Sequence, residues 1–187
     1  IVTTGAFHED GLADVADGFG GGTTIARKLE IMKDSRVGAF GAVAACLSIL
    51  LRVVAIGALI EARPPGSVAA VLVATAILSR LAGLIPLAML PPARGDGASA
   101  QFGRPGRAEM IAGFAIAAAL IAAATMLAGW PSALAPAMFG SAIVAGLLVT
   151  WLSARQIQGH TGDVAGAAQQ VAEIACLITP LAATFAQ

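Results

Sequence analysis

Three aspartates near the start of the chain have the spacing of one helix face. Asp10, Asp14 and Asp17 follow an i, i+4, i+7 pattern, so in a helix their carboxylates lie on the same side. Like charges at this spacing repel each other, which indicates that a cation binds between them. Mg²⁺ is usually held by one or two carboxylates together with substrate phosphates. We therefore predict a catalytic Mg²⁺ site at these three aspartates, with His8 as a candidate base or ligand.

The alternative for this run is a solvated acidic helix face, which is what most charge runs in proteins are. However, four of the eleven carboxylates in the chain, the first of them Glu9, lie within residues 9–17. Acid is otherwise scarce in this sequence, so its concentration at one place favours a metal site over a solvated face.

A second polar motif covers residues 30–38. Glu30 and Asp34 are again four residues apart, and cations lie beside them. An interfacial helix whose cations anchor the apolar stretch that follows would explain the same charges. The glycines at 20–22 lie between the two motifs and allow a sharp reversal, so we predict that the two acidic faces meet and that both are catalytic. The donors predicted to bind phosphate in this motif are Lys33, Ser35 and Arg36.

Charged side chains also occur farther along the chain, within or beside apolar stretches. Arg80 lies well inside one of them and is a candidate phosphate ligand, although its side chain could instead reach back to the membrane surface. Arg52 is closer to the end of its stretch, so we expect it to reach the surface. Arg94 follows a proline pair and is predicted to meet phosphate at the mouth of the site. Asp163 is either a helix cap or a site residue, and Glu173 is expected to face the interior, toward Arg80 or the metal.

The composition assigns these motifs to a membrane protein. Of the 187 residues, 58% are hydrophobic and 12% are charged, whereas soluble domains are about 25% charged. A helix that spans the bilayer needs about 20 mainly apolar residues. Five stretches meet this condition: 37–60, 68–90, 110–128, 134–152 and 164–185. We predict an all-α, polytopic transmembrane bundle of about five spans in one domain, 1–187, with an acidic helical segment at 3–36 and the bundle at 37–187.

The distribution of basic residues predicts how the bundle is oriented. If the five spans alternate, the side that carries the acidic segment also carries eight basic residues, and the opposite side carries only Arg63. The eight are Arg27, Lys28, Lys33, Arg36, Arg94, Arg104, Arg107 and Arg155. Lys and Arg are retained on the cytoplasmic side of short loops, so we expect the site to face the cytoplasm from a bacterial inner membrane. The net charge of zero gives no reason to expect nucleic acid as a partner; membrane lipid and a second copy of the chain are the candidates.

The two acidic motifs resemble those of a known family. Residues 8–18 and 29–38 closely resemble the cobalamin synthase family of adenosylcobinamide-GDP ribazoletransferases, and residues 159–163 resemble the C-terminal signature of that family. A departure is the stretch at 4–7, where members usually carry a glycine pair before the histidine. Members typically begin with additional apolar helices, which this chain is expected to lack. Further positions that match the motifs are Gly11, Gly38, Gly162, Asp163 and Glu173.

The resemblance implies a reaction and a cofactor. Such an enzyme transfers the adenosylcobinamide-phosphate moiety of adenosylcobinamide-GDP to α-ribazole, or to α-ribazole 5′-phosphate, and releases GMP. It implies Mg²⁺ at Asp10, Asp14 and Asp17, with Glu30 and Asp34 as a second acidic set and His8 or a carboxylate as proton acceptor. The cations at positions 33, 36, 80 and 94 would balance phosphate charge.

Two other functions remain open on the sequence. A CDP-alcohol phosphotransferase is also membrane-embedded and rich in aspartate. Its motif requires Asp-Gly-x-x-Ala-Arg, but here Asp10-Gly11 is followed by Leu12-Ala13-Asp14, with no arginine in place. A transporter or channel would also place acid and arginine inside a helical bundle, but it does not need long acidic motifs outside the spans.

Overall fold

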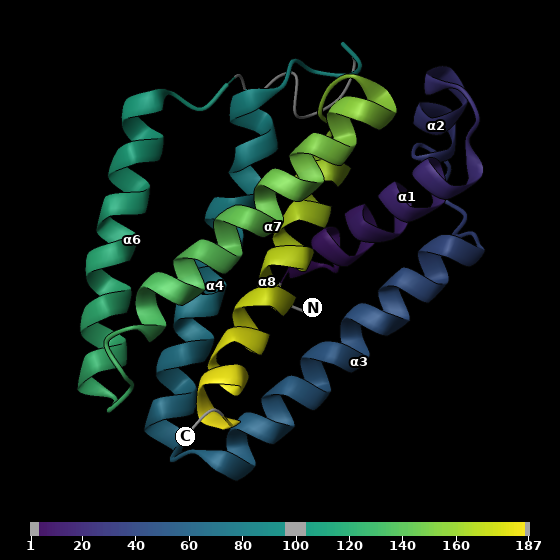
Figure 1. Ribbon diagram of the computed structural model, residues 1–187. Helices are drawn as coiled ribbons and strands as arrows, with labels where there is room; N and C mark the ends of the chain where they lie inside the picture. Colours follow the sequence, from purple (N-terminus) through teal and green to yellow (C-terminus); the bar gives the residue numbers. More distant parts are fainter. Residues whose placement is uncertain (1–3, 96–103, 186–187) are drawn as a thin grey trace.

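The computed structural model of the protein describes residues 4–95 and 104–185, and these residues form helices without a strand (Figure 1). The helices are α1 (Phe7–Gly21), α2 (Ile25–Ile31), α3 (Ala39–Ala62), α4 (Pro65–Met89), α6 (Arg107–Leu127), α7 (Leu134–Ile157) and α8 (Gly162–Phe185). Five of them, α3, α4, α6, α7 and α8, are long and apolar enough to cross a membrane. The predicted all-α bundle with five spans is therefore confirmed. The largest difference is at α7, which continues five residues beyond the predicted end at 152.

The last helix is the centre of the bundle. α8 packs against α4, α7, α1 and α3, and in Figure 1 it runs through the middle of the molecule. Its buried face consists largely of small side chains, among them Ala167, Ala168, Ala172 and Cys176. Small side chains allow helix backbones to approach closely, which is how helices associate in membranes. The same helix also carries buried glutamines, so it brings polar groups into the centre of the fold.

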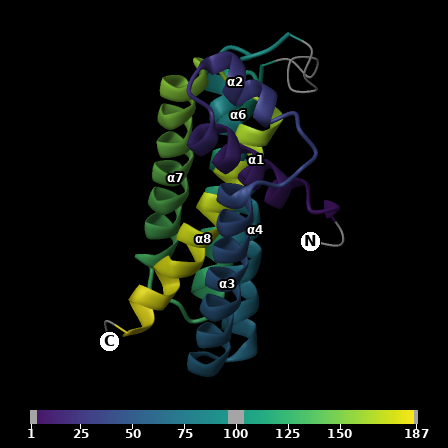
Figure 2. The ribbon, with the colours of Figure 1, turned by 90° about the vertical axis from the view of Figure 1, so that its right-hand side faces the viewer.

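The acidic segment is packed into the bundle and does not lie apart from it. α1 crosses obliquely over α3 and α8, and its first turn lies about halfway along the bundle (Figures 1 and 2). Its apolar side is anchored by Val15, which packs in a cluster with Met32, Val149 and Val164. His8 and Glu9 therefore lie beside the middle of the spans, while the C-terminal end of α1 reaches α2 at the end of the bundle.

The outward faces of two helices are apolar and exposed. Along α3 these residues include Val43, Leu47, Leu50 and Val54, and α6 is exposed in the same way along much of its length. α3 contacts α1 and α8 but barely touches α4, its neighbour in sequence. Because α3 and α4 barely touch, polar groups of α1 and α8 can lie in the interior between them.

Candidate active site

The N-terminal turns of α1 and α8 run antiparallel and touch at the backbone. A Cβ at Gly11 would lie 2.8 Å from the carbonyl oxygen of Asp163, so no other residue fits there without moving one of the helices. One turn away, Gly166 lies against the backbone of His8. This contact places Asp10 and Asp14 beside Asp163, although the two motifs are at opposite ends of the sequence.

Negative charge is crowded at this contact. Burial and the neighbouring carboxylates of Asp10, Asp163 and Asp17 raise the pKa of Asp14 to about 7, and Arg94 acts in the opposite direction. Asp10 itself is exposed and Asp14 is half-buried. A carboxyl group with such a pKa is partly protonated at neutral pH, and a cation that bound there would favour its ionised form.

Arg94 is the cation held closest to this cluster. Its Nη2 donates to Oδ2 of Asp163 at 2.8 Å, and Thr161 donates to the same oxygen at 3.0 Å. Its Nε and Nη1 groups are buried and have no hydrogen-bond partner within residues 4–95 and 104–185. The guanidinium thus keeps donors beyond those used by Asp163, as expected of a group that also binds an anion. Below, the name α1–α8 cluster means Asp10, Asp14, Asp163 and Arg94.

A short backbone pairing fixes Arg94 in place. Ala93 N donates to the carbonyl of His160, and His160 N donates to the carbonyl of Pro91, both at 2.8 Å. A Cβ at Gly159 would lie 2.7 Å from Ala93 N, so glycine permits this close approach. The loop after α4 is therefore tied to the start of α8, which explains why a loop arginine and a helix aspartate meet.

Asp17 has a different role from the other two aspartates of its predicted set. It is buried, and its two carboxylate oxygens accept hydrogen bonds from Gly38 N at 2.7 Å and Gly41 N at 2.9 Å. These N–H groups belong to the N-terminal turn of α3, where unpaired donors and the helix dipole favour a carboxylate. Asp17 therefore caps α3 from a different helix.

The role of Asp17 as the cap of α3 can be tested by substitution. Asp17→Asn would place an amide NH₂ opposite one of the two backbone donors, so we expect a loss of about 1.5–3 kcal/mol in unfolding free energy, the usual value of a hydrogen bond to a charged group. Thermal unfolding of the purified protein in Mg²⁺-free buffer measures this loss. The exposed residue on the same helix gives the matched control, Asp10→Asn. Equal stability of the two variants without Mg²⁺ would contradict the capping role.

The second acidic motif lies apart from the α1–α8 cluster. Glu30 pairs with Arg27 at 2.8 Å, and Asp34 pairs with Arg36 at 2.6 Å. Asp34 is partly buried, and the other three residues are exposed. The Arg36 guanidinium lowers the pKa of Asp34 to about 2. These four residues line a separate hollow of about 240 Å³ together with Asp17. The predicted meeting of the two acidic faces is thus limited to Asp17, and Lys33 and Ser35 are exposed in the turn that follows.

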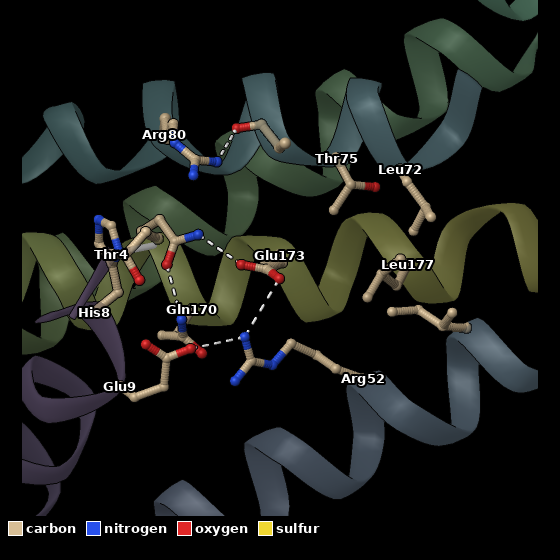
Figure 3. Close-up of a pocket in the computed structure, with 13 residues that line it drawn as sticks. Thr4, His8, Glu9, Arg52, Leu72, Thr75, Arg80, Gln170, Glu173 and Leu177 are labelled. Atoms are coloured by element: carbon tan, nitrogen blue, oxygen red, sulfur yellow. Dashed lines mark hydrogen bonds and ion pairs between the residues drawn. The ribbon is translucent and has the colours of Figure 1, made fainter. Parts of the chain in front are cut away.

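A polar pocket lies between α3, α4 and α8, beneath the first turn of α1 (Figure 3). Its volume is about 190 Å³. Arg52 of α3 donates through Nη1 to Glu9 at 3.0 Å and to Glu173 at 3.4 Å, so one guanidinium joins α1 to α8. His8 and Arg80 complete the ionisable lining, and burial together with the Arg80 guanidinium lowers the pKa of His8. The imidazole is therefore neutral at pH 7 and can accept a proton.

Glutamines of α8 extend this polarity into the core. Gln169 donates to Glu173 at 2.6 Å and to Ser79 at 3.2 Å. Gln170 donates to Gln169 at 3.0 Å and accepts from Ser48 at 2.9 Å. A chain of hydrogen bonds thus links α3, α4 and α8 at the depth of the spans, where polar groups are expensive and usually serve function.

The prediction that Arg52 reaches the membrane surface is wrong. Its side chain is only 12% exposed, because two carboxylates from other helices hold it inside the bundle. Glu173 faces the interior as predicted, but its ion-pair partner is Arg52 and not Arg80. Sequence reasoning also missed Glu9 and Gln169 as lining residues of the pocket. The rule that singled out Arg80, that a charge inside a span is functional, applied equally to Arg52.

Comparison with known proteins assigns the chain to a family. The cobalamin-5-phosphate synthase family matches residues 1–181. A protein of Azorhizobium caulinodans named adenosylcobinamide-GDP ribazoletransferase is 48% identical over 178 residues, which cover 95% of this chain and 67% of that protein. Proteins with the same name from Sinorhizobium medicae and Xanthobacter autotrophicus are 44% and 48% identical, over 93% and 95% of this chain and 66% and 67% of their own lengths.

The chain therefore spans about two thirds of the length of these relatives. No solved structure matches it. The family match covers the acidic segment, four spans in full and α8 as far as residue 181, including the α1–α8 cluster and the polar pocket. The chain thus belongs to the cobalamin-5-phosphate synthase family, the ribazoletransferases of cobalamin biosynthesis.

Proposed function

We propose that the α1–α8 cluster binds Mg²⁺ and the diphosphate of adenosylcobinamide-GDP, and that the chain transfers adenosylcobinamide phosphate to α-ribazole or its 5′-phosphate. The observation that carries the proposal is the crowding of Asp14 against Asp10 and Asp163, which raises the pKa of Asp14 to about 7. The names of the relatives supply the substrate and the acceptor. Arg94 forms an ion pair with Asp163 in the cluster and has further donors for a phosphate.

The donor set of the cluster fits Mg²⁺ with substrate present. Within the described residues, no three His, Cys, Asp or Glu side chains are close enough together to hold a metal ion on their own. Mg²⁺ keeps several waters and is usually held by one or two carboxylates plus substrate phosphates. Asp14 with Asp10 or Asp163 would supply the two carboxylates, so we assign the metal to these residues. We do not assign it to Asp17, because the carboxylate of Asp17 caps α3. When bound, Mg²⁺ neutralises the diphosphate and stabilises the leaving phosphate.

The chemistry exchanges one P–O bond for another. The acceptor oxygen, a ribose hydroxyl that α-ribazole and its 5′-phosphate share, forms a bond to the phosphorus that carries adenosylcobinamide. The bond from this phosphorus to the GMP oxygen breaks, and GMP leaves with the bonding electron pair. The hydroxyl proton passes to His8, which is neutral and lies on the same helical turn as Asp10. Arg94 offers donors to the phosphate oxygens as charge develops on them.

The same proposal includes an orientation. The basic residues gather on the side of the acidic segment, which supports a site facing the cytoplasm from a bacterial inner membrane. Lipid would cover the exposed apolar faces of α3 and α6. A second copy of the chain is another candidate to cover part of these faces.

The test is release of GMP by the purified protein in lipid nanodiscs. We expect GMP to appear from adenosylcobinamide-GDP only when α-ribazole or its phosphate and Mg²⁺ are both present, and to stop when EDTA removes the metal. Vesicle uptake of the same corrinoid in the absence of acceptor separates transfer from transport. Uptake without GMP release, or GMP release that is indifferent to EDTA, would contradict the proposal.

A further inference from the structure

Two arginines that the proposed transfer does not use lie together at one end of the bundle. Arg104 precedes α6 and Arg107 is its first residue, and both are exposed. They line a hollow of about 480 Å³ where α4 ends and α6 begins, together with Met89, Met110 and Ile111. In Figure 1 the end of α4 and the start of α6 lie at the same end of the bundle as α2. Below, this space is called the α4–α6 hollow.

Neither arginine of the α4–α6 hollow is paired with an acid. Within residues 4–95 and 104–185, no carboxylate lies within 4.0 Å of the guanidinium of Arg104 or Arg107. By contrast, Arg27 and Arg36 at the same end of the bundle each have an acidic partner. The nearest acid in sequence, Glu109, is not among the lining residues. Two cations without a counter-charge favour an anion, and the planar fork of arginine suits phosphate.

The other walls of the hollow are largely apolar, which favours a lipid over a soluble anion. Met89 and Ile111 are 55% and 70% exposed, although both are large hydrophobic side chains. The hollow opens beside α6, which is long and apolar enough to cross a membrane and has little of its surface buried in the bundle. A soluble phosphate bound to the arginines would leave these apolar side chains in water. A phospholipid would cover them with its acyl chains while its phosphate met the arginines.

The size and the depth of the hollow also fit a lipid headgroup. Its volume of about 480 Å³ lies within the range of about 300–1,000 Å³ that is usual for small-molecule pockets. It lies at the ends of two spans, which is the level at which headgroups of a bilayer are found. Basic pockets between spans on the cytoplasmic side are known sites for anionic headgroups.

We propose that the α4–α6 hollow binds one anionic phospholipid, with Arg104 and Arg107 on its phosphate and Met89, Met110 and Ile111 against the start of its acyl chains. This lipid site is independent of the proposed transfer, because none of its residues belongs to the α1–α8 cluster or to the polar pocket. It ties the end of α4 to the start of α6 through a molecule of the bilayer.

The test is native mass spectrometry of the whole chain, released from nanodiscs that contain equal amounts of phosphatidylglycerol and phosphatidylcholine with the same acyl chains. We expect the unsubstituted protein to retain phosphatidylglycerol in preference to phosphatidylcholine. Arg104→Gln and Arg107→Gln should each lower the ratio of the two bound lipids about 5-fold, as a contribution of about 1 kcal/mol per basic residue implies. Both side chains are exposed, so the variants should fold, and thermal unfolding in phosphatidylcholine alone checks this.

The matched control is Arg155→Gln, which removes one positive charge from the last turn of α7. Arg155 is exposed, lies over the ring of Trp151 at 5.0 Å and does not line the hollow. This variant should keep the preference for phosphatidylglycerol. If all three single variants lose the preference equally, it comes from the general surface charge and the proposed site is wrong. Equal retention of the two lipids by the unsubstituted protein would also overturn the proposal.

A further arm of the experiment identifies the source of the phosphate. A large excess of inorganic phosphate, added before the protein is released, should displace little of the bound phosphatidylglycerol, because the free ion cannot cover the apolar walls. Displacement by inorganic phosphate would show that the hollow binds a soluble anion and would overturn the assignment to lipid. GMP release is not measured in this experiment, so a failure of the proposed transfer and a failure of the lipid site are distinguishable.

Discussion

Asp14→Asn is expected to lower Mg²⁺-dependent GMP release by at least about 100-fold. A metal at a phosphoryl group contributes several kcal/mol of transition-state stabilisation, and about 1.4 kcal/mol corresponds to a factor of ten in rate. Asparagine keeps the size of the side chain but cannot carry the charge that balances the cation. The charges of Asp10 and Asp163 both act on Asp14, so no other substitution in the α1–α8 cluster should cost more activity.

The same substitution should stabilise the protein when no metal is present. The pKa of Asp14 rises from 3.8 to about 7 on folding, so between these values the folded state binds more protons than the unfolded state. Stability therefore falls as the pH rises from about 4 to about 7, and the full penalty remains above pH 7. Asparagine has no such penalty, so its advantage over aspartate should be absent near pH 4 and largest near pH 8.

Thermal unfolding at pH 5 and pH 8, with and without Mg²⁺, checks this prediction alongside the kinetic assay. We expect Mg²⁺ to raise the unfolding temperature of the unsubstituted protein at pH 8 but not that of Asp14→Asn. Glu61→Gln, an exposed position near the far end of α3, is the control for loss of one negative charge. If Asp14→Asn retains normal turnover, or is less stable than the control at pH 8, the assignment of the cluster fails.

Arg52→Met should have the largest effect on stability. The guanidinium joins Glu9 to Glu173, whose side chains are only 11% and 25% exposed, so its removal leaves two carboxylates inside the bundle without their ion-pair partner. Removing one partner of a buried ion pair typically costs about 3–5 kcal/mol. Glu9 would also lose its tie to α8, so the first turn of α1 should become mobile and GMP release should fall with stability.

The control is Arg80→Met, which removes another arginine from within a span. Arg80 is exposed and has no acidic partner within 4.0 Å among the described residues, so its loss should cost much less stability. A second readout is whether neutralising the two carboxylates restores the stability that Arg52→Met loses. If uncompensated charge is the cause, Arg52→Met combined with Glu9→Gln and Glu173→Gln should unfold at a higher temperature than Arg52→Met alone. If Arg52→Met alone is as stable as Arg80→Met, the ion pairs of Arg52 contribute little to stability.

The fold class followed from the sequence because hydropathy is a local property. Each predicted span coincides with an apolar helix, and the differences at the ends, such as the extra turn and a half of α7, come from polar residues that continue a helix beyond the bilayer core. The motif at 8–18 was also readable, since the spacing of Asp10 and Asp14 defines a helix face before any packing is known.

The partners of each charged residue could not be read in this way. Asp17 has the same spacing as Asp10 and Asp14, yet it caps α3 because α1 crosses that helix beside Gly38 and Gly41. Arg52 was expected at the membrane surface, yet Glu9 and Glu173 hold it in the bundle. In both cases the deciding group belongs to another helix.

The sequence by itself determined that this is a membrane-embedded helical protein with an acidic motif suited to a metal and a diphosphate. Only the tertiary structure decided that Asp163 and Arg94 join Asp14, and that a separate polar pocket lies on the other side of α1. The physical reason is that helical periodicity fixes which residues share a face, whereas the antiparallel contact of α1 with α8 at Gly11 depends on packing between segments far apart in the chain.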